Sequence, residues 1–338
     1  SPSQFATRTY TGAERVQCML CAMTLPPISS EQETMVSRSW RPRTRLWRVA
    51  RSLRFCVAVI CSTFGAPLVA GDMMADSPVT FPEKGALPSK HPPDVRVKSE
   101  PTEKGYFIFE SPCRSVAQID LIQSEMPPGK FTSPQADWTH LLRTQKILRD
   151  GGELRIVAIG DSIVNDTMRS GWVAKLAEAY PKAAITTTVY VRGGGGCQHY
   201  REESRLQKNV IPRQPHLVFI GGISQKGVED IRAVIEQLRA AIPDVEFLLA
   251  TGTFGRSDPR DVESLAKAKH SGTGEYGNSL KQLAAETGCA YLDMTSPWAE
   301  YIRSSGLHPH LFYRDRVHAN TFGEQILCKI LMGFFTTE

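Results

Sequence analysis

The strongest constraint on the fold of this chain is an alternation of short apolar runs with helical patterns after residue 150. Five runs of apolar or β-branched residues are bounded by turn residues: Leu154–Ile159, Ile185–Val191, Leu217–Ile220, Val245–Ala250 and Ala290–Leu292. Helical patterns separate them, the clearest of which runs from Val228 to Ile242. Continuous apolar runs are typical of strands buried on both faces, and strand–helix alternation is typical of parallel sheets. The sequence therefore predicts an α/β domain with helices on both faces of a five-stranded parallel sheet.

The basic charge of the chain is confined to its first 70 residues. The formal net charge is +5, whereas nine arginines and three glutamates give residues 1–70 a charge of +6. Residues 71–338 therefore carry −1 and offer no electrostatic reason to expect a nucleic-acid partner. A hydrophobic fraction of 41% is enough to build a core, which excludes a disordered or collagen-like chain.

A secretory signal is predicted between residues 36 and 70. Seven arginines lie between Arg38 and Arg54, and an uncharged run of sixteen residues follows and ends before Gly71. A basic region, an apolar region and a final small residue are the parts of a signal peptide, and a membrane span needs about 20 apolar residues. We therefore expect an extracytoplasmic mature chain with no stable membrane span; the alternative is an uncleaved signal anchor. We interpret Met35 as the translation start and residues 1–34 as an artefact of gene calling.

Residues 71–150 are interpreted as an arm that precedes the domain of residues 151–338. The arm is rich in proline and charge, with one strand-like run at Tyr106–Glu110. We expect a short helix near Val116–Ile122 and a second helix over Ala136–Arg149. The spacing of the cysteines predicts no disulfide pairing, and we attribute the C-x-x-C of Cys18 and Cys21 to chance.

The first apolar run ends in the motif Gly160-Asp161-Ser162. In parallel sheets ligands bind at the carboxyl ends of strands, and a serine at the turn into the next helix lies beside free backbone N–H groups. Such donors can stabilise the oxyanion that forms during acyl transfer. The structural alternative is that Ser162 caps the helix and Asp161 is a turn residue.

A second motif, Asp315-x-x-His318, precedes the last helical pattern. An aspartate three residues before a histidine can accept a hydrogen bond from the imidazole Nδ1–H, which leaves Nε2 to take a proton from a serine. Taken alone, this motif could also be a helix cap with a surface histidine. The G-x-S-x-G string of α/β-hydrolases is absent.

Together, A-I-G-D-S-I from residue 158 and D-R-V-H-A-N-x-x-G from residue 315 resemble the first and last conserved blocks of the SGNH/GDSL hydrolases. The resemblance covers about Leu154 to the C-terminus. It implies a flavodoxin-like three-layer α/β/α sandwich and ester hydrolysis by a triad of Ser162, His318 and Asp315, with no metal or organic cofactor. Members of the family include carbohydrate acetylesterases, lysophospholipases and thioesterases.

The same resemblance implies three oxyanion donors: the backbone N–H of Ser162, a glycine N–H after the second strand and an asparagine after the third. Gly196, the last of four consecutive glycines, matches the second donor, with a flexible turn as the alternative. The family has G-x-N-D after the third strand, whereas this chain has no asparagine from Gly221 to Gln225. We favour the Gln225 amide as the third donor, and the Ser224 hydroxyl is the alternative.

Weaker candidates each have a structural alternative. Asn165 and Asp166 could shape an acyl pocket or cap a helix, and His199 could contact substrate or lie free on the surface. His308 and His310 lack the further ligands of a metal site. Three aromatic residues could form a platform for a sugar or pack in the core: Trp298, Tyr301 and Phe312.

The sequence thus predicts an exported serine ester hydrolase whose partner is an acylated small molecule or polysaccharide. Export, a net charge near zero and the lack of an apolar lipid-binding helix favour a carbohydrate O-acetylesterase, by analogy with the family. One alternative is a lipase or thioesterase for longer acyl chains. The other is a catalytically silent polysaccharide-binding module, which the missing asparagine suggests.

We predict that the mature protein begins near Gly71, because cleavage after Ala70 removes the basic and apolar regions together. N-terminal sequencing of secreted or periplasmic protein, after expression of the whole chain, checks this prediction. A cytoplasmic product that retains Arg54 would contradict it.

Overall fold

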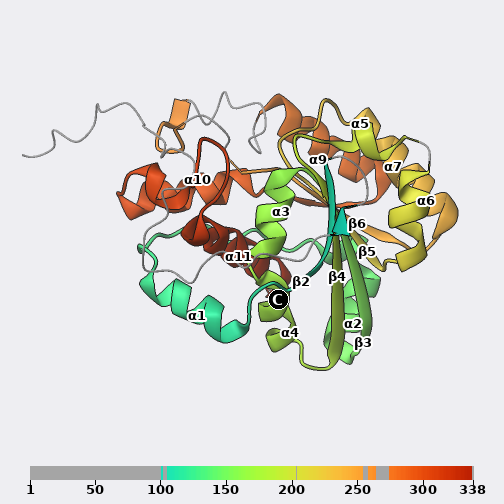
Figure 1. Cartoon of the computed structure of the whole chain (residues 1–338), viewed down its shortest axis with the longest axis horizontal. Coiled ribbons are helices and arrows are strands. Elements are labelled where there is room, and N and C mark those ends of the chain that lie inside the picture. Colours follow the sequence, from blue (N-terminus) through green and yellow to red (C-terminus); the bar gives the residue numbers. More distant parts are fainter. Residues whose placement is uncertain (1–99, 102–104, 203, 254–257, 264–273, 337–338) are drawn as a thin grey trace, which may run out of the picture. The chain divides into compact units, whose positions relative to one another are not determined.

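The fold is organised around one sheet with the strand order β1-β2-β4-β3-β5-β6-β7 (Figure 1). The computed structural model describes residues 100–101, 105–202, 204–253, 258–263 and 274–336, all of which belong to the unit Ala70–Glu338. The predicted leader and signal segment, with Cys18 and Cys21, lie outside the described residues.

The five predicted strands form the parallel part of the sheet. They are β3 (Gly152–Gly160), β4 (Ala183–Arg192), β5 (Leu217–Ile220), β6 (Glu246–Ala250) and β7 (Ala290–Leu292). Neighbouring strands of this set pair in parallel, with β4 and β5 on either side of β3. This order, 2-1-3-4-5 along the five strands, is the flavodoxin-like one, so the predicted fold class is confirmed.

The complete sheet is larger than predicted because the arm extends it. β2 (Tyr106–Ser111) pairs antiparallel with β4, and β1 (Glu100–Pro101) pairs antiparallel with β2. The expectation of a purely parallel sheet of five strands is therefore corrected to a mixed sheet of seven. The physical reason is the free edge of β4, whose backbone N–H and C=O groups find partners in the arm.

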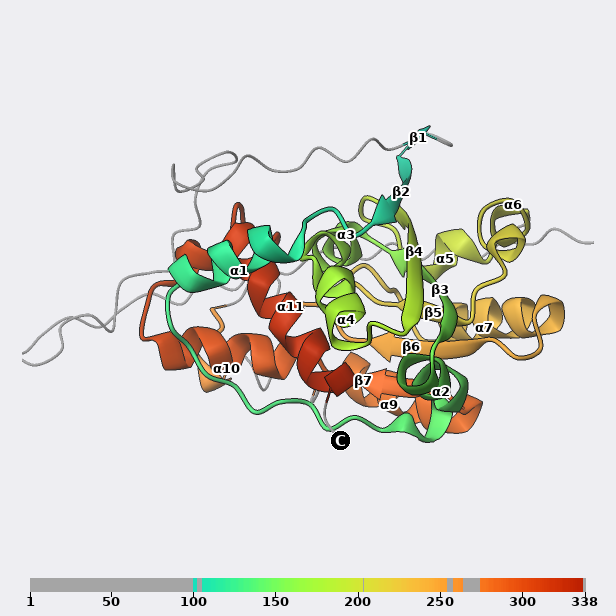
Figure 2. The same ribbon diagram turned by 90° about the horizontal axis from the view of Figure 1, so that it is seen from below.

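Helices cover both faces of the sheet (Figure 2). One face carries α1 (Val116–Glu125), α2 (Leu142–Asp150), α3 (Ser162–Arg169), α4 (Trp172–Ala179), α10 (Thr295–Ser305) and α11 (Thr321–Thr336). The other carries α5 (Cys197–Tyr200), α6 (Arg205–Asn209), α7 (Glu229–Ala241) and α9 (Glu275–Thr287). Successive β3 side chains enter opposite cores, since Ile156 and Ala158 face the first set, whereas Val157 and Ile159 face the second.

The helices of the arm were predicted with unequal success. The short helix near Val116 is confirmed as α1, whose start is capped by Ser115. The helix expected over Ala136–Arg149 is wrong at its start, because α2 begins only at Leu142. A separate 3₁₀ turn, η1 (Trp138–His140), precedes it, and two more, η2 (Ile211–Arg213) and η3 (Pro309–Phe312), lie further along the chain. The Asp137 carboxylate accepts the Thr139 N–H and so starts the first of these turns ahead of the helix.

The aromatic residues considered as a sugar platform belong to the core. Trp298 and Phe312 are 0% exposed and Tyr301 is 3% exposed. The Trp298 Nε1–H donates to the Tyr313 hydroxyl at 2.8 Å, so its polar atom is also satisfied inside the protein. These three residues therefore pack in the core and do not form a platform for a sugar.

Four cysteines lie in the described part of the chain, and all four are free thiols: Cys113, Cys197, Cys289 and Cys328. Burial raises the pKa of Cys113 to about 11 and that of Cys328 to about 12. None of the helices in the described ranges is long and apolar enough to span a membrane.

A buried ion pair fastens the arm to the domain. The Arg114 guanidinium pairs with the carboxylate of Glu324 in α11 and donates to the Arg169 carbonyl oxygen at 2.6 Å. The two paired side chains are only 4% and 1% exposed. Because removing one partner of a buried pair leaves the other charge without compensation, this contact contributes strongly to the cohesion of the fold.

We predict that Arg114→Met lowers the free energy of unfolding by about 3–5 kcal/mol, because the Glu324 carboxylate stays buried without the guanidinium. Urea unfolding of the protein measures the loss. The matched control is Arg149→Met, which removes an exposed pair with Asp150 and should lower the free energy of unfolding far less. Equal losses in the two variants would contradict a special role for the buried pair.

Candidate active site

Ser162 lies at the turn from β3 into α3, as predicted. It is the first residue of α3, and the side chain of Asp161 caps the helix by accepting the Ile163 N–H at 2.9 Å. The alternative in which Ser162 itself is the cap is therefore wrong. Its backbone N–H donates to no acceptor among the described residues, as is usual for the first turn of a helix.

The Asp161 carboxylate also binds the loop after β5. Its second oxygen accepts the backbone N–H groups of Ile223 at 2.8 Å and Ser224 at 2.7 Å. Gly222, with φ +102°, packs so closely on this carboxylate that a Cβ there would overlap it. A carboxylate that is 1% exposed thus joins the ends of two neighbouring strands beside Ser162.

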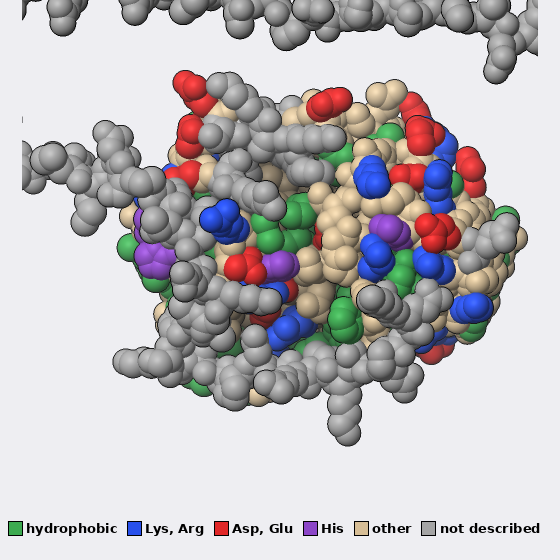
Figure 3. Space-filling model, turned by 45° about the horizontal axis from the view of Figure 1, so that its top comes forward, with side chains coloured by type: hydrophobic (Ala, Val, Ile, Leu, Met, Phe, Trp, Pro, Cys, Tyr) green, Lys and Arg blue, Asp and Glu red, His purple; other side chains and the backbone are tan. Residues whose placement is uncertain are grey.

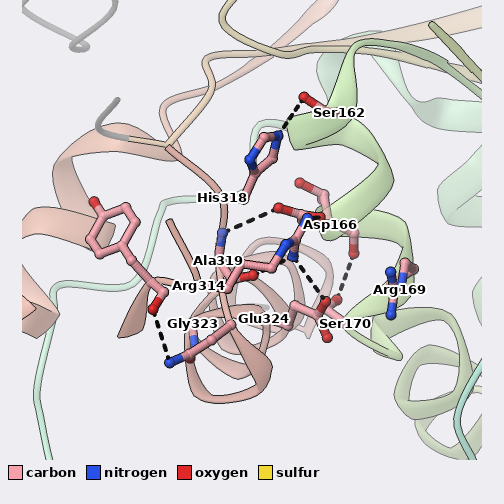
Figure 4. Close-up of polar contacts among 12 residues, drawn as sticks. Ser162, Asp166, Arg169, Ser170, Arg314, His318, Ala319, Gly323 and Glu324 are labelled. Carbon is pink, nitrogen blue, oxygen red and sulfur yellow. Dashed lines mark hydrogen bonds and ion pairs between the residues drawn. The ribbon is translucent and has the colours of Figure 1, made fainter. Parts of the chain in front are cut away.

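His318 and Asp315 complete a hydrogen-bonded chain with Ser162. The imidazole Nδ1 lies 2.7 and 2.9 Å from the two oxygens of Asp315. Its Nε2 lies 2.8 Å from the Ser162 Oγ (Figure 4). With the Nδ1 proton directed to the carboxylate, Nε2 is the acceptor for the serine hydroxyl. The structure therefore brings together the three residues that the two motifs predicted.

The carboxylate of Asp315 is held in its ionised form. Partial burial raises its pKa, but hydrogen bonds from the Val317 N–H, the His318 N–H and the imidazole outweigh burial and lower the pKa below its ordinary value. At neutral pH a negative charge therefore stands behind the imidazole and favours its protonated form during proton transfer.

Asp166 neither lines a pocket nor caps α3, so both sequence interpretations of it are wrong. It is 0% exposed; its carboxylate pairs with Arg314 at 2.6 Å and accepts the Ala319 N–H at 3.1 Å. Burial raises the pKa of Asp166 to about 7; the Glu324 charge adds to this shift, and Arg314 and His318 oppose it. Asp166 lies one helical turn after Ser162, so the two side chains share one face of α3.

The glycine loop after β4 carries Gly196, the candidate second oxyanion donor. Its backbone N–H, like that of Ser162, meets no acceptor among the described residues. The left-handed residue in this loop is Gly194, with φ +65°, and not Gly196. At Gly196 the constraint is space, because a Cβ would lie 2.6 Å from the side-chain oxygens of Gln198 and Gln225.

The Gln225 amide bridges two loops. Its oxygen accepts the Cys197 N–H at 2.8 Å, and its nitrogen donates to the Gly221 carbonyl oxygen at 3.2 Å. Burial raises the pKa of the Cys197 thiol, and a hydrogen bond with the same Gln225 amide opposes this rise. The Ser224 hydroxyl makes no hydrogen bond with the described residues, whereas the Ser224 N–H binds Asp161. The third-donor assignment of Gln225 or Ser224 stays a prediction.

The other histidines weighed from the sequence, His199, His308 and His310, form no hydrogen bond with Ser162, His318 or Asp315. His199 accepts from Arg192 at 2.8 Å, and burial, together with Arg192, lowers its pKa. His308 and His310 are neighbours in η3 and its cap. In the part of the chain that the structure describes, His, Cys, Asp and Glu form no group that could hold a metal ion. Figure 3 shows a histidine with acidic and basic side chains near the middle of one face, beside hydrophobic side chains.

Comparison with known proteins gives matches among solved structures. A protein described as a GDSL-like lipase from Parabacteroides merdae matches at 19% identity and a TM-score of 0.43, covering 54% of this chain and 96% of its own. An acetylxylan esterase from Geobacillus stearothermophilus matches at 20% identity and a TM-score of 0.44, covering 56% and 96%. A family 3 carbohydrate esterase from Talaromyces cellulolyticus matches at 12% identity and a TM-score of 0.37, covering 53% and 94%. Neither the family models nor the curated proteins searched gave a match.

The fold is the flavodoxin-like α/β/α sandwich that the sequence resemblance implies. The sheet order and the position of Ser162 after the central strand β3 are those that the sequence resemblance implies. The resemblance is thus confirmed at the level of fold.

Proposed function

We propose that this protein is a serine ester hydrolase in which Ser162 is the nucleophile, His318 the general base and acid, and Asp315 the residue that orients His318. One observation carries the proposal, namely the unbroken chain of hydrogen bonds from the Asp315 carboxylate through the imidazole to the Ser162 hydroxyl. A carboxylate, an imidazole and a hydroxyl in this order form an activated nucleophile.

The first half of the reaction transfers the acyl group to the enzyme. The Ser162 oxygen attacks the ester carbonyl carbon while its proton passes to His318 Nε2, 2.8 Å away. The carbonyl oxygen becomes an oxyanion, for which the free N–H groups of Ser162 and Gly196 are the candidate donors. The bond to the leaving oxygen then breaks, and this oxygen takes the proton from His318 as the alcohol departs.

The second half returns the enzyme to its starting state. Water attacks the acyl carbon and gives a proton to His318, and the bond to Ser162 breaks as the serine oxygen regains that proton. The carboxylic acid leaves. In both halves Asp315 keeps its negative charge, which stabilises the imidazolium.

For the substrate class we propose a carbohydrate O-acetyl ester and an extracytoplasmic site of action. This choice rests on the family resemblance together with the predicted signal and the near-zero charge of residues 71–338. Chain-length dependence tests it, with p-nitrophenyl acetate, butyrate, octanoate and palmitate as substrates. A preference for acetate supports the proposal, whereas a preference for octanoate or palmitate supports a lipase or thioesterase.

A fluorophosphonate probe tests the reaction class independently of the substrate. An activated serine forms a covalent adduct with the probe, and a binding module without catalysis does not. We expect labelling of the wild-type protein at Ser162, located by peptide mass spectrometry. Absence of the adduct would favour a silent polysaccharide-binding module.

We predict that Ser162→Ala and His318→Ala each lower kcat on p-nitrophenyl acetate by about three or more orders of magnitude. The double variant should lose little more, because the two residues act as a unit. Steady-state kinetics measures all three variants. Near-normal turnover by Ser162→Ala would contradict the assignment of Ser162 as the nucleophile.

The third oxyanion donor gives a separate prediction. We expect Gln225→Ala to lower kcat about a hundredfold with KM little changed, and Ser224→Ala to lower it less than about tenfold. Both variants are measured with the same ester. The reverse order would transfer the role to Ser224, and two unchanged variants would leave an oxyanion hole of two backbone donors.

A further inference from the structure

Ser162 and Asp166 lie four residues apart in α3 and therefore on the same face of the helix, one turn from each other. Both contact the loop that carries His318. Ser162 binds the imidazole at 2.8 Å, whereas Asp166 accepts the backbone N–H of Ala319, the residue that follows His318, at 3.1 Å (Figure 4). Helix α3 thus binds the side chain of His318 through Ser162 and the main chain next to His318 through Asp166.

The loop held in this way is closed on itself. Tyr313 and Ala319 form an antiparallel bridge, and the Arg314 N–H donates to the His318 carbonyl oxygen at 3.0 Å. The base of the loop is the place where its two ends, at Tyr313 and Ala319, come together. There the Arg314 guanidinium binds the Ala319 carbonyl oxygen and, at 2.6 Å, the Asp166 carboxylate. A displacement of this base would therefore carry His318 with it.

We propose that Asp166 is a positioning residue that sets the distance between His318 and Ser162 by fixing the base of the loop to α3. This inference rests on the proposed function. Proton transfer depends on hydrogen-bond distance, and a misplacement of about 1 Å can lower a rate about a hundredfold. Asp166 is itself fully buried, so it acts through the loop and not on the substrate.

Asparagine is the sharpest replacement because it keeps the size of the side chain. Both partners of Asp166, the Arg314 guanidinium and the Ala319 N–H, are hydrogen-bond donors. The NH₂ group of an asparagine would face one of these donors whichever way the amide lies. Asp166→Asn therefore breaks one of the two attachments while the helix stays intact.

The rate of labelling by a fluorophosphonate probe reports how well Ser162 is activated, without reference to a natural substrate. The protein is labelled at pH 8, where the carboxylate of Asp166 is ionised, since its pKa is about 7. We expect Asp166→Asn to be labelled about tenfold to a hundredfold more slowly than wild type. On p-nitrophenyl acetate, kcat should fall by a similar factor with KM little changed.

The matched control is Leu238→Ala, because Leu238 in α7 is fully buried in the core on the other face of the sheet from α3 and the His318 loop. Its thermal stability should fall at least as far as that of Asp166→Asn, while its labelling rate stays within about threefold of wild type. If Asp166→Asn does not fold, Arg314→Gln removes the same contact from its partly exposed side and should slow labelling severalfold.

Labelling of Asp166→Asn within about twofold of wild type would overturn the positioning role, as would an equal slowing in Leu238→Ala. If the wild-type protein itself is not labelled, the proposed function fails, and the positioning role fails with it. The two failures are therefore distinguishable in one experiment.

Discussion

The Asp161 carboxylate is the contact on which the arrangement of the site depends. It caps α3 with one oxygen and accepts two backbone N–H groups from the loop after β5 with the other. A buried carboxylate with three N–H donors is well satisfied, and separating the ends of β3 and β5 would break its hydrogen bonds to the Ile223 and Ser224 N–H groups. The position of Ser162 relative to the neighbouring loops follows from this one side chain.

A second set of buried charges organises the opposite side of Ser162. Asp166 in α3 and Glu324 in α11 face Arg314 from the His318 loop and Arg114 from the arm. The arm is thus bound to α3, which carries Ser162, and to α11, which follows His318. Strand β2 of the arm pairs with β4, and Arg114 of the arm compensates the buried charge of Glu324.

Much of this fold could be predicted because its signals are local. Strand runs and helix faces lie within a few residues each, so periodicity and turn chemistry were sufficient to place β3 to β7. The pairing of the two motifs, together with the family resemblance, pointed to Ser162, Asp315 and His318. The ion pairs were missed because their partners are 148 residues apart for Asp166 and Arg314 and 210 apart for Arg114 and Glu324. Periodicity carries no information about such contacts, and the pairing of β2 with β4 was missed for the same reason.

The four free cysteines have a consequence for where such a protein can work. Burial raises the pKa of every one of these thiols, including that of Cys197 directly after Gly196 in the glycine loop. Oxidation and disulfide exchange proceed through the thiolate, which is scarce at neutral pH in these positions. In the folded domain these thiols therefore react slowly with oxidants and with disulfides. This protection comes from burial, so it is present only once the domain has folded.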